Sequence, residues 1–145
     1  MRYLIFLFIA LLTVPGSVSY AQQQNEPWSD KQLLATETLA SSIEQGKTED
    51  LLILTIGPDA IIKGSVDIGP AMEKENVEKL RAYLNDLPKD KEVVIYCGCC
   101  PFDRCPNIRP AFKLLNELGF KNAKLLDIPR NIKVDWLDKD YPIND

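Results

Sequence analysis

The fold is indicated most clearly by residues 93 to 120, VVIYCGCCPFDRCPNIRPAFKLLNELGF. The stretch opens with an apolar run, Val93 to Cys97, which is typical of a strand buried on both faces of a parallel sheet. It closes with apolar residues at helical spacing from Ile108 to Leu118, and Gly119 is a natural residue just past a helix end. Asn107 is predicted to cap that helix. The stretch therefore predicts a strand, a loop and a helix.

Two more buried strands are predicted on either side of this unit. Leu51 to Ile56 is a second continuous apolar run, and Ala123 to Asp127 is a third. Between the first two strands, apolar residues recur at helical spacing from Val77 to Leu87, and Pro88 ends that helix. Strands separated by helices favour parallel pairing. We therefore expect an α/β domain whose central parallel sheet is flanked by helices on both faces.

A helix is also predicted upstream, over residues 29 to 45. Ser29 is a typical N-cap, and Gln32 stands three residues later as its capping-box partner. Apolar residues from Leu33 to Ile43 would line the buried side of the helix, and Gly46 would end it.

The N-terminus has the pattern of a secretory signal peptide. Arg2 supplies the positive charge, Tyr3 to Val14 is almost wholly apolar, and Ser19-Tyr20-Ala21 is a small-residue cleavage site. The apolar run is short for a membrane span. We therefore expect a signal peptide over residues 1–21 and a domain over residues 22–145 that is exported to a periplasm or the medium, without membrane association after cleavage.

Composition excludes several function classes. The chain of 145 residues has a net charge of −4 and no basic stripe, which argues against nucleic-acid binding. It contains no histidine, so Ser-His-Asp and Cys-His catalysis are excluded and the commonest nitrogen ligand for metals is missing. A reactive cysteine would have to be activated by backbone dipoles, arginine or lysine.

The chemistry is expected in the loop between the strand and the helix of residues 93 to 120. Within nine residues this loop holds all four cysteines of the chain, Cys97, Cys99, Cys100 and Cys105. The carboxyl edge of a parallel sheet is where ligands bind, and the N-terminus of the next helix favours anions, including thiolates and persulfides. Arg104 and Arg109 add positive charge, and we expect them to be anion-binding groups.

The region resembles the active site of the rhodanese-like domain family. Tyr96-Cys97 matches the family's strand end, and Ala111, Leu115 and Gly119-Phe120 match the helix that follows. Residues 51 to 70 and 122 to 136 resemble the flanking parts of the same domain. The resemblance implies that Cys97 is the catalytic residue that takes up sulfane sulfur as a persulfide. It also implies a sulfane-sulfur donor or a protein thiol as the partner, and we expect no cofactor.

The extra cysteines leave three interpretations open. In one, the protein is a sulfurtransferase or thiol-redox protein in which Cys99, Cys100 or Cys105 attacks the modified Cys97 and forms a disulfide. In another, the cysteines are structural, Cys100–Cys105 is the easiest bridge, and the stapled loop is a non-catalytic module for partner binding. In the third, thiolates from these four cysteines bind Cu(I) or another soft metal; the spacing lacks the paired knuckles of a zinc site.

Overall fold

The structure is a computed structural model that describes residues 26–145. The predicted signal peptide, residues 1–21, lies outside these residues. The described strands are β1 (Leu33–Ala35), β2 (Leu51–Thr55), β3 (Val66–Asp67), β4 (Glu92–Tyr96) and β5 (Asn122–Asp127). The α-helices are α1 (Thr36–Glu44), α2 (Lys74–Asn85), α3 (Ile108–Glu117) and α4 (Ile132–Asp135), and short 3-10 turns cover Asp30–Gln32, Phe102–Arg104 and Leu137–Lys139.

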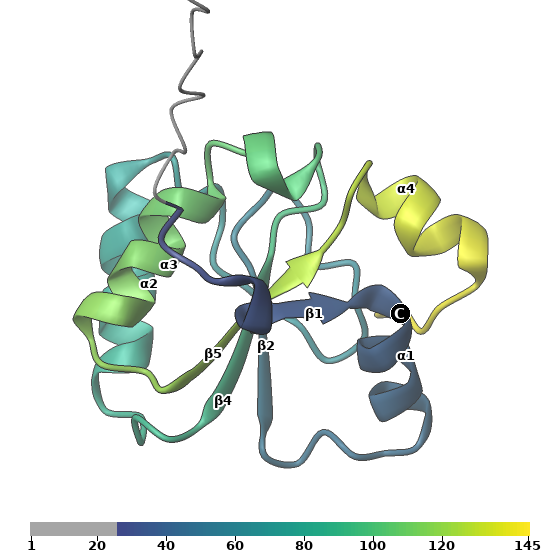
Figure 1. Ribbon diagram of the computed structural model, residues 1–145, viewed down its shortest axis with the longest axis horizontal. Coiled ribbons are helices and arrows are strands. Elements are labelled where there is room, and N and C mark those ends of the chain that lie inside the picture. The colour runs from purple at the N-terminus through teal and green to yellow at the C-terminus, as the bar shows by residue number, and fades with distance from the viewer. Residues whose placement is uncertain (1–25) are drawn as a thin grey trace, which may run out of the picture.

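The strands form one sheet in the order β1-β5-β4-β2-β3, and every pair in it is parallel. Helices α2 and α3 cover one face of the sheet, while α1 and α4 lie on the other (Figure 1). The predicted α/β architecture with helices on both faces is therefore confirmed. Among residues 26–145, no helix combines the length and the apolar character needed to cross a membrane.

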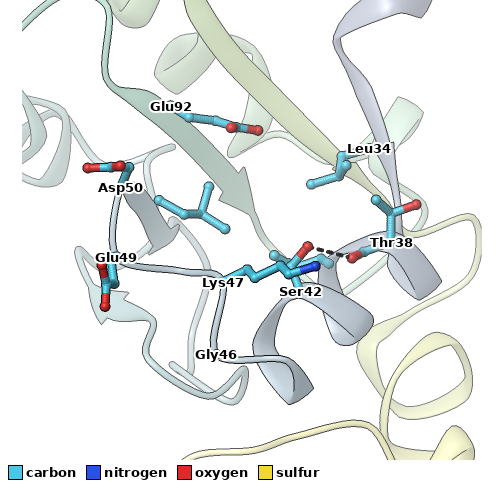
Figure 2. Close-up of a pocket in the computed structure, with 10 residues that line it drawn as sticks. Leu34, Thr38, Ser42, Gly46, Lys47, Glu49, Asp50 and Glu92 are labelled. Atoms are coloured by element: carbon cyan, nitrogen blue, oxygen red, sulfur yellow. Dashed lines mark hydrogen bonds between the residues drawn. The ribbon is translucent and has the colours of Figure 1, made fainter.

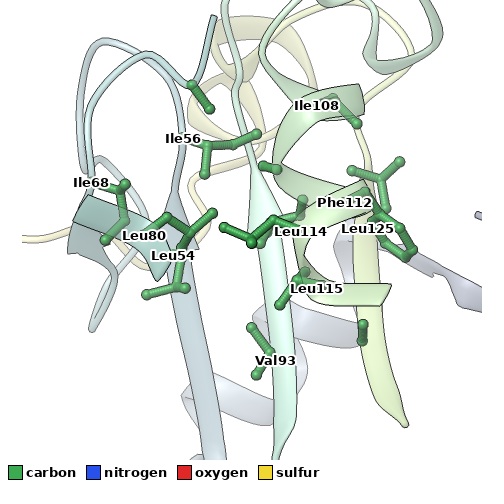
Figure 3. Packing of buried hydrophobic residues seen from close by; sticks show 14 of the residues in the cluster. Leu54, Ile56, Ile68, Leu80, Val93, Ile108, Phe112, Leu114, Leu115 and Leu125 are labelled. Carbon is green, nitrogen blue, oxygen red and sulfur yellow. The ribbon is translucent and has the colours of Figure 1, made fainter. Parts of the chain in front are cut away.

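Strand β4 is buried on both faces because its side chains alternate between two apolar clusters. Val93 and Ile95 belong to the cluster under α2 and α3, which Figure 3 shows from close by. Val94 and Tyr96 belong to the cluster under α1 and α4, which also contains the fully buried Trp136. Complete burial of one large apolar side chain stabilises a fold by roughly 1.5–3 kcal/mol. The two clusters therefore fix the central strand, and the residue that follows it, from both sides.

The structure corrects the prediction of one helix over residues 29 to 45. The capping contact forms, since the Ser29 N–H donates to Oε1 of Gln32 at 2.9 Å, but only a 3-10 turn follows it. Leu33–Ala35 instead pairs with β5 as the edge strand β1, and α1 begins at Thr36. Leu33 packs on the α2/α3 cluster and Leu34 on the α1/α4 cluster, so the segment follows the two-residue period of a strand. Gly46 follows the helix end in the left-handed conformation, as predicted.

Parallel pairing brings the carboxyl ends of the strands to one edge of the sheet. The loop that follows β2 meets the loop that follows β4 there, because the Ile56 N–H donates to the Tyr96 carbonyl at 2.9 Å. The loop after β5 joins them through the Phe102 N–H, which donates to the Ile128 carbonyl at 3.0 Å. Three loops therefore meet around the cysteines.

Candidate active site

Cys97 comes directly after β4, and only 4% of its surface is exposed. The chain turns sharply at the next residue, Gly98, whose φ of 83° lies in the region that favours glycine. A side chain at Gly98 would also collide with Ile132, whose Cβ would lie 2.8 Å from the added carbon. The Gly98 carbonyl accepts the Ile132 N–H at 2.8 Å, which ties the loop to the start of α4. Glycine at this position thus fixes the orientation of Cys97.

Three of the cysteine sulfurs form one cluster. The Sγ atoms of Cys97 and Cys99 are 3.2 Å apart, those of Cys99 and Cys105 are 4.0 Å apart, and all three lie within 4.8 Å of one another. Cys97 and Cys105 are buried, whereas Cys99 is exposed. The Cys100 sulfur is 3.2 Å from that of Cys99 but does not belong to the mutually close group.

All four cysteines are free thiols in the structure. A disulfide bond is about 2.05 Å long, so the contacts of 3.2 Å between sulfurs are non-bonded. The Cys100–Cys105 bridge, which the structural interpretation of the cysteines favours, is not formed in the structure. The loop is held instead by backbone hydrogen bonds and by its packing on the core.

Asn107 is a site residue that the sequence did not reveal. Its side chain makes no capping hydrogen bond to α3, contrary to the prediction. Its Nδ2 donates to Sγ of Cys97 at 3.2 Å, while its Oδ1 accepts the Met72 N–H at 2.8 Å. The residue is buried, with 4% of its surface exposed. An asparagine before a helix usually caps it, so the contact with Cys97 could not be inferred from the sequence.

Gly57 closes the other side of Cys97. A Cβ at Gly57 would lie 2.5 Å from the Cys97 carbonyl oxygen and 2.8 Å from its Sγ, closer than side-chain carbons approach other atoms. The loop after β2 therefore passes directly against the sulfur, and only a residue without a side chain fits.

The arrangement favours a thiolate at Cys97. Its pKa is lowered to about 5, because it accepts hydrogen bonds from Cys105, from the backbone and thiol of Cys99 and from Asn107, and these outweigh the effect of burial. Burial and the neighbouring sulfurs raise the pKa of Cys99 to about 12. The pKa of Cys105 is also raised, chiefly because its proton is donated to Cys97. One sulfur thus carries the negative charge, and two protonated thiols stabilise it.

The two arginines lie in different surroundings. Arg109 Nη2 is 2.5 Å from Glu26 Oε1 and donates to the Asp103 carbonyl at 2.6 Å, and its guanidinium lies 5.6 Å from the centre of the Trp28 ring. Arg109 therefore holds residues 26 to 28 against the cysteine loop. Arg104 is exposed. A role in binding anions stays a prediction for both.

A hollow of about 490 Å³ lies far from the cysteines (Figure 2). It is bounded by α1 and by residues at the amino ends of β2 and β4, Leu51 and Glu92. Polar and charged side chains line much of it, including those of Thr38, Lys47 and Asp50. This is the sheet edge opposite to Cys97, so the hollow does not serve the thiol cluster.

Comparisons with known proteins bear on the fold. No protein-family model and no curated protein matches the chain. The solved structure of the single-domain sulfurtransferase RDL2 from Saccharomyces cerevisiae is similar, with 18% identity over 77% of this chain and 94% of that one and a TM-score of 0.50. The 3-mercaptopyruvate sulfotransferase SseA from Escherichia coli, described as having the rhodanese fold, matches with 16% identity over 70% of this chain and 43% of that one and a TM-score of 0.42. The likeness to RDL2 and the order of the parallel sheet together show that the chain folds as a rhodanese-like α/β domain.

Proposed function

We propose that the protein is an exported rhodanese-like sulfur carrier in which Cys97 accepts a sulfane sulfur and passes it to a thiol. One observation carries the proposal: the buried Cys97 sulfur is surrounded by hydrogen-bond donors, with Asn107 Nδ2 and Cys99 Sγ each 3.2 Å away. Such donors stabilise the extra negative charge of a thiolate or a persulfide. The site resembles that of the rhodanese-like family, in which the cysteine at the strand end is the sulfur acceptor.

The reaction needs two displacements at sulfur. In the first, the Cys97 thiolate attacks the outer sulfur of a donor such as thiosulfate; the donor's S–S bond breaks, sulfite leaves with the bonding pair, and a new S–S bond forms on Cys97. In the second, an acceptor thiolate attacks that outer sulfur and the Cys97 thiolate is restored. No step requires histidine, which the chain lacks.

Cys99 allows a second reaction of the Cys97 persulfide. Its exposed thiol lies 3.2 Å from the Cys97 sulfur, within reach for an attack on a persulfidated Cys97. In that attack the Cys99 proton passes to the departing sulfur, which leaves as hydrosulfide, and a Cys97–Cys99 disulfide forms, which an external dithiol would reduce to both thiols. The sulfur-transfer and thiol-redox forms of the proposal therefore begin from the same intermediate.

Export rests on the sequence of residues 1–21, which has the charge, apolar run and cleavage site of a signal peptide. RDL2 is called a sulfurtransferase, which is consistent with sulfur transfer on this fold. Transfer to a protein thiol would suit a compartment in which exported proteins form and exchange disulfides.

Mass spectrometry of the purified, fully reduced protein tests the proposal. After incubation with thiosulfate, or with a small persulfide, the intact mass should rise by one sulfur atom, and cyanide should remove it. The increment should be absent in Cys97→Ser and present in Cys100→Ser, which is the matched control in the same loop. Circular dichroism would confirm that both variants fold. If no donor gives the wild type either a sulfur increment or the loss of two hydrogens that marks a disulfide, or if the increment persists in Cys97→Ser, the proposal is contradicted.

A further inference from the structure

We infer that Cys97, Cys99 and Cys105 also form a three-coordinate site for Cu(I), a soft monovalent cation. This inference goes beyond sulfur transfer and stands on its own geometry. The three sulfurs lie within 4.8 Å of one another, and they come from the end of β4, the exposed part of the loop and the turn before α3. A single ion placed between them would bridge these three positions.

The distances suit a trigonal ion. Metal–thiolate bonds are about 2.3 Å long, so three sulfurs around a metal in one plane stand about 4.0 Å apart. The Cys99–Cys105 separation is already 4.0 Å, and the Cys97–Cys99 separation of 3.2 Å has to open by about 0.8 Å. Cys99 is the exposed member of the cluster, so its side chain can move by that amount without disturbing the core.

The donor set selects a soft ion with few ligands. Thiolates prefer Cu(I), which is satisfied by two or three of them, whereas structural zinc takes four ligands in a tetrahedron. Only cysteines belong to the close group among the described residues, and the chain has no histidine to complete a zinc site. Cys100, the one remaining cysteine, lies outside the close group. The set is therefore complete for Cu(I) and one ligand short for structural zinc.

The surroundings hold two ligands still and leave the third accessible. Asn107 donates to the Cys97 sulfur and is itself anchored by the Met72 N–H, which fixes the ligand as outer hydrogen bonds do in metal sites. Cys105 is fully buried, and its N–H donates to the Phe102 carbonyl at 3.3 Å. Cys99 is exposed, so the ion would enter and leave on its side.

Anaerobic titration of the reduced protein against the coloured Cu(I) chelator bathocuproine disulfonate tests the inference. The protein should withdraw one Cu(I) per chain, and X-ray absorption should show three sulfur neighbours. Cys99→Ser, which alters an exposed residue, should weaken Cu(I) binding at least tenfold. Cys105→Ser should do the same if circular dichroism shows it folded. Cys100→Ser, the neighbouring control, should bind within twofold of the wild type.

Several outcomes would overturn the inference. The inference is wrong if the protein withdraws no Cu(I) from the chelator, or if it takes up more than one Cu(I) per chain. It is also wrong if Cys100→Ser and Cys99→Ser weaken Cu(I) binding equally, or if the protein binds zinc through four sulfurs more tightly than it binds Cu(I). Cu(I) withdrawal is measured without a sulfur donor and sulfur loading without metal, so the two assays on the wild type separate failure of the metal site from failure of sulfur transfer.

Discussion

The side-chain amide of Asn107 joins Sγ of Cys97 to the backbone of another loop. Nδ2 lies 3.2 Å from the sulfur, and Oδ1 accepts the Met72 N–H at 2.8 Å. A backbone N–H can only donate, so the amide oxygen must face Met72 and the NH₂ group must face the sulfur. The loop that precedes α2 therefore sets the direction of the hydrogen bond to Cys97.

Replacing Asn107 should make Cys97 less acidic. In Asn107→Ala the thiolate loses one charge-assisted hydrogen bond, which is worth roughly 1.5–3 kcal/mol, so the pKa of Cys97 should rise by about one to two units. The variant should also be less stable by about 0.5–1.5 kcal/mol, because the hydrogen bond from the Met72 N–H is lost. Alkylation rates across pH and urea unfolding measure the two effects.

Asn85→Ala is the control for this substitution, because the Asn85 side chain contacts Asp86 on the surface of the protein. Asn85→Ala should change neither the pKa of Cys97 nor the free energy of unfolding appreciably. An unchanged pKa of Cys97 in Asn107→Ala would show that the amide does not stabilise the thiolate.

The pH dependence of Cys97 should set it apart from the other thiols. With its pKa lowered to about 5, it should react with a small neutral alkylating reagent at pH 6, where an ordinary thiol of pKa about 8.5 is almost wholly protonated. The rate should fall with a midpoint near pH 5. Peptide mapping after brief alkylation at pH 6 should find the label on Cys97. Equal labelling of Cys97 and Cys100 would contradict a specific activation.

The same shift has a consequence for stability. A pKa that is lower in the folded than in the unfolded protein stabilises the fold above the unfolded value of about 8.5, and the contribution disappears as pH falls to about 5. The difference in unfolding free energy between the reduced wild type and Cys97→Ser should therefore shrink over this range. Chemical unfolding at pH 8.5, 7 and 5 measures it. A difference that grows as pH falls would contradict a lowered pKa of Cys97 in the folded protein.

Gly57→Ala should displace Cys97. The added methyl group would lie 2.5 Å from the Cys97 carbonyl oxygen and 2.8 Å from its sulfur, so the loop or the strand end must move. Overpacking of this kind destabilises by typically 1–3 kcal/mol. Unfolding should report that loss, and sulfur loading at Cys97 should slow. Gly46→Ala is a useful contrast, because open space surrounds Gly46 and only its positive φ is strained; it should lower stability without slowing loading.

Substitution of the two arginines should have different effects, one on stability and the other on substrate binding. Arg109→Gln loses the ion pair with Glu26 and the contact with Trp28, so it should lower the unfolding temperature. Arg104→Gln should leave that temperature unchanged and raise the KM for thiosulfate by up to about fivefold, because an exposed ion pair is worth at most about 1 kcal/mol. Steady-state kinetics and thermal unfolding of both variants provide the check. A KM effect confined to Arg109→Gln would reverse the assignment.

Much of the fold could be predicted because the buried strands are continuous apolar runs in the sequence. The continuous apolar run of residues 93 to 97 has no stable place except between two layers, and the structure buries it there. Strand β1 could not be found in this way. Its three residues, Leu33–Ala35, contain good helix formers, and pairing with β5 overrides that preference. That pairing joins residues far apart in the sequence, so no local pattern contains it.

The site was predictable to a similar extent. Position in the chain was enough to place Cys97 at the carboxyl edge of the sheet. The pattern did not reveal which of the other cysteines would approach it, since this depends on the path of the loop: Cys105 lies eight residues away and is in the cluster, whereas Cys100 lies three away and is not. The role of Asn107 depends on Met72, which lies in another loop, and was equally hidden.

The close approach of Gly57 to Cys97 would constrain the order of events in the proposed sulfur transfer. With Gly57 packed on one side of the sulfur and Asn107 on another, incoming molecules must reach it from the side of Cys99. If Cys97 carries sulfur, the donor and the acceptor must use this same approach, so one has to leave before the other binds. Initial-rate plots should then be parallel lines, the signature of a ping-pong mechanism, and each substrate should inhibit competitively against the other at high concentration.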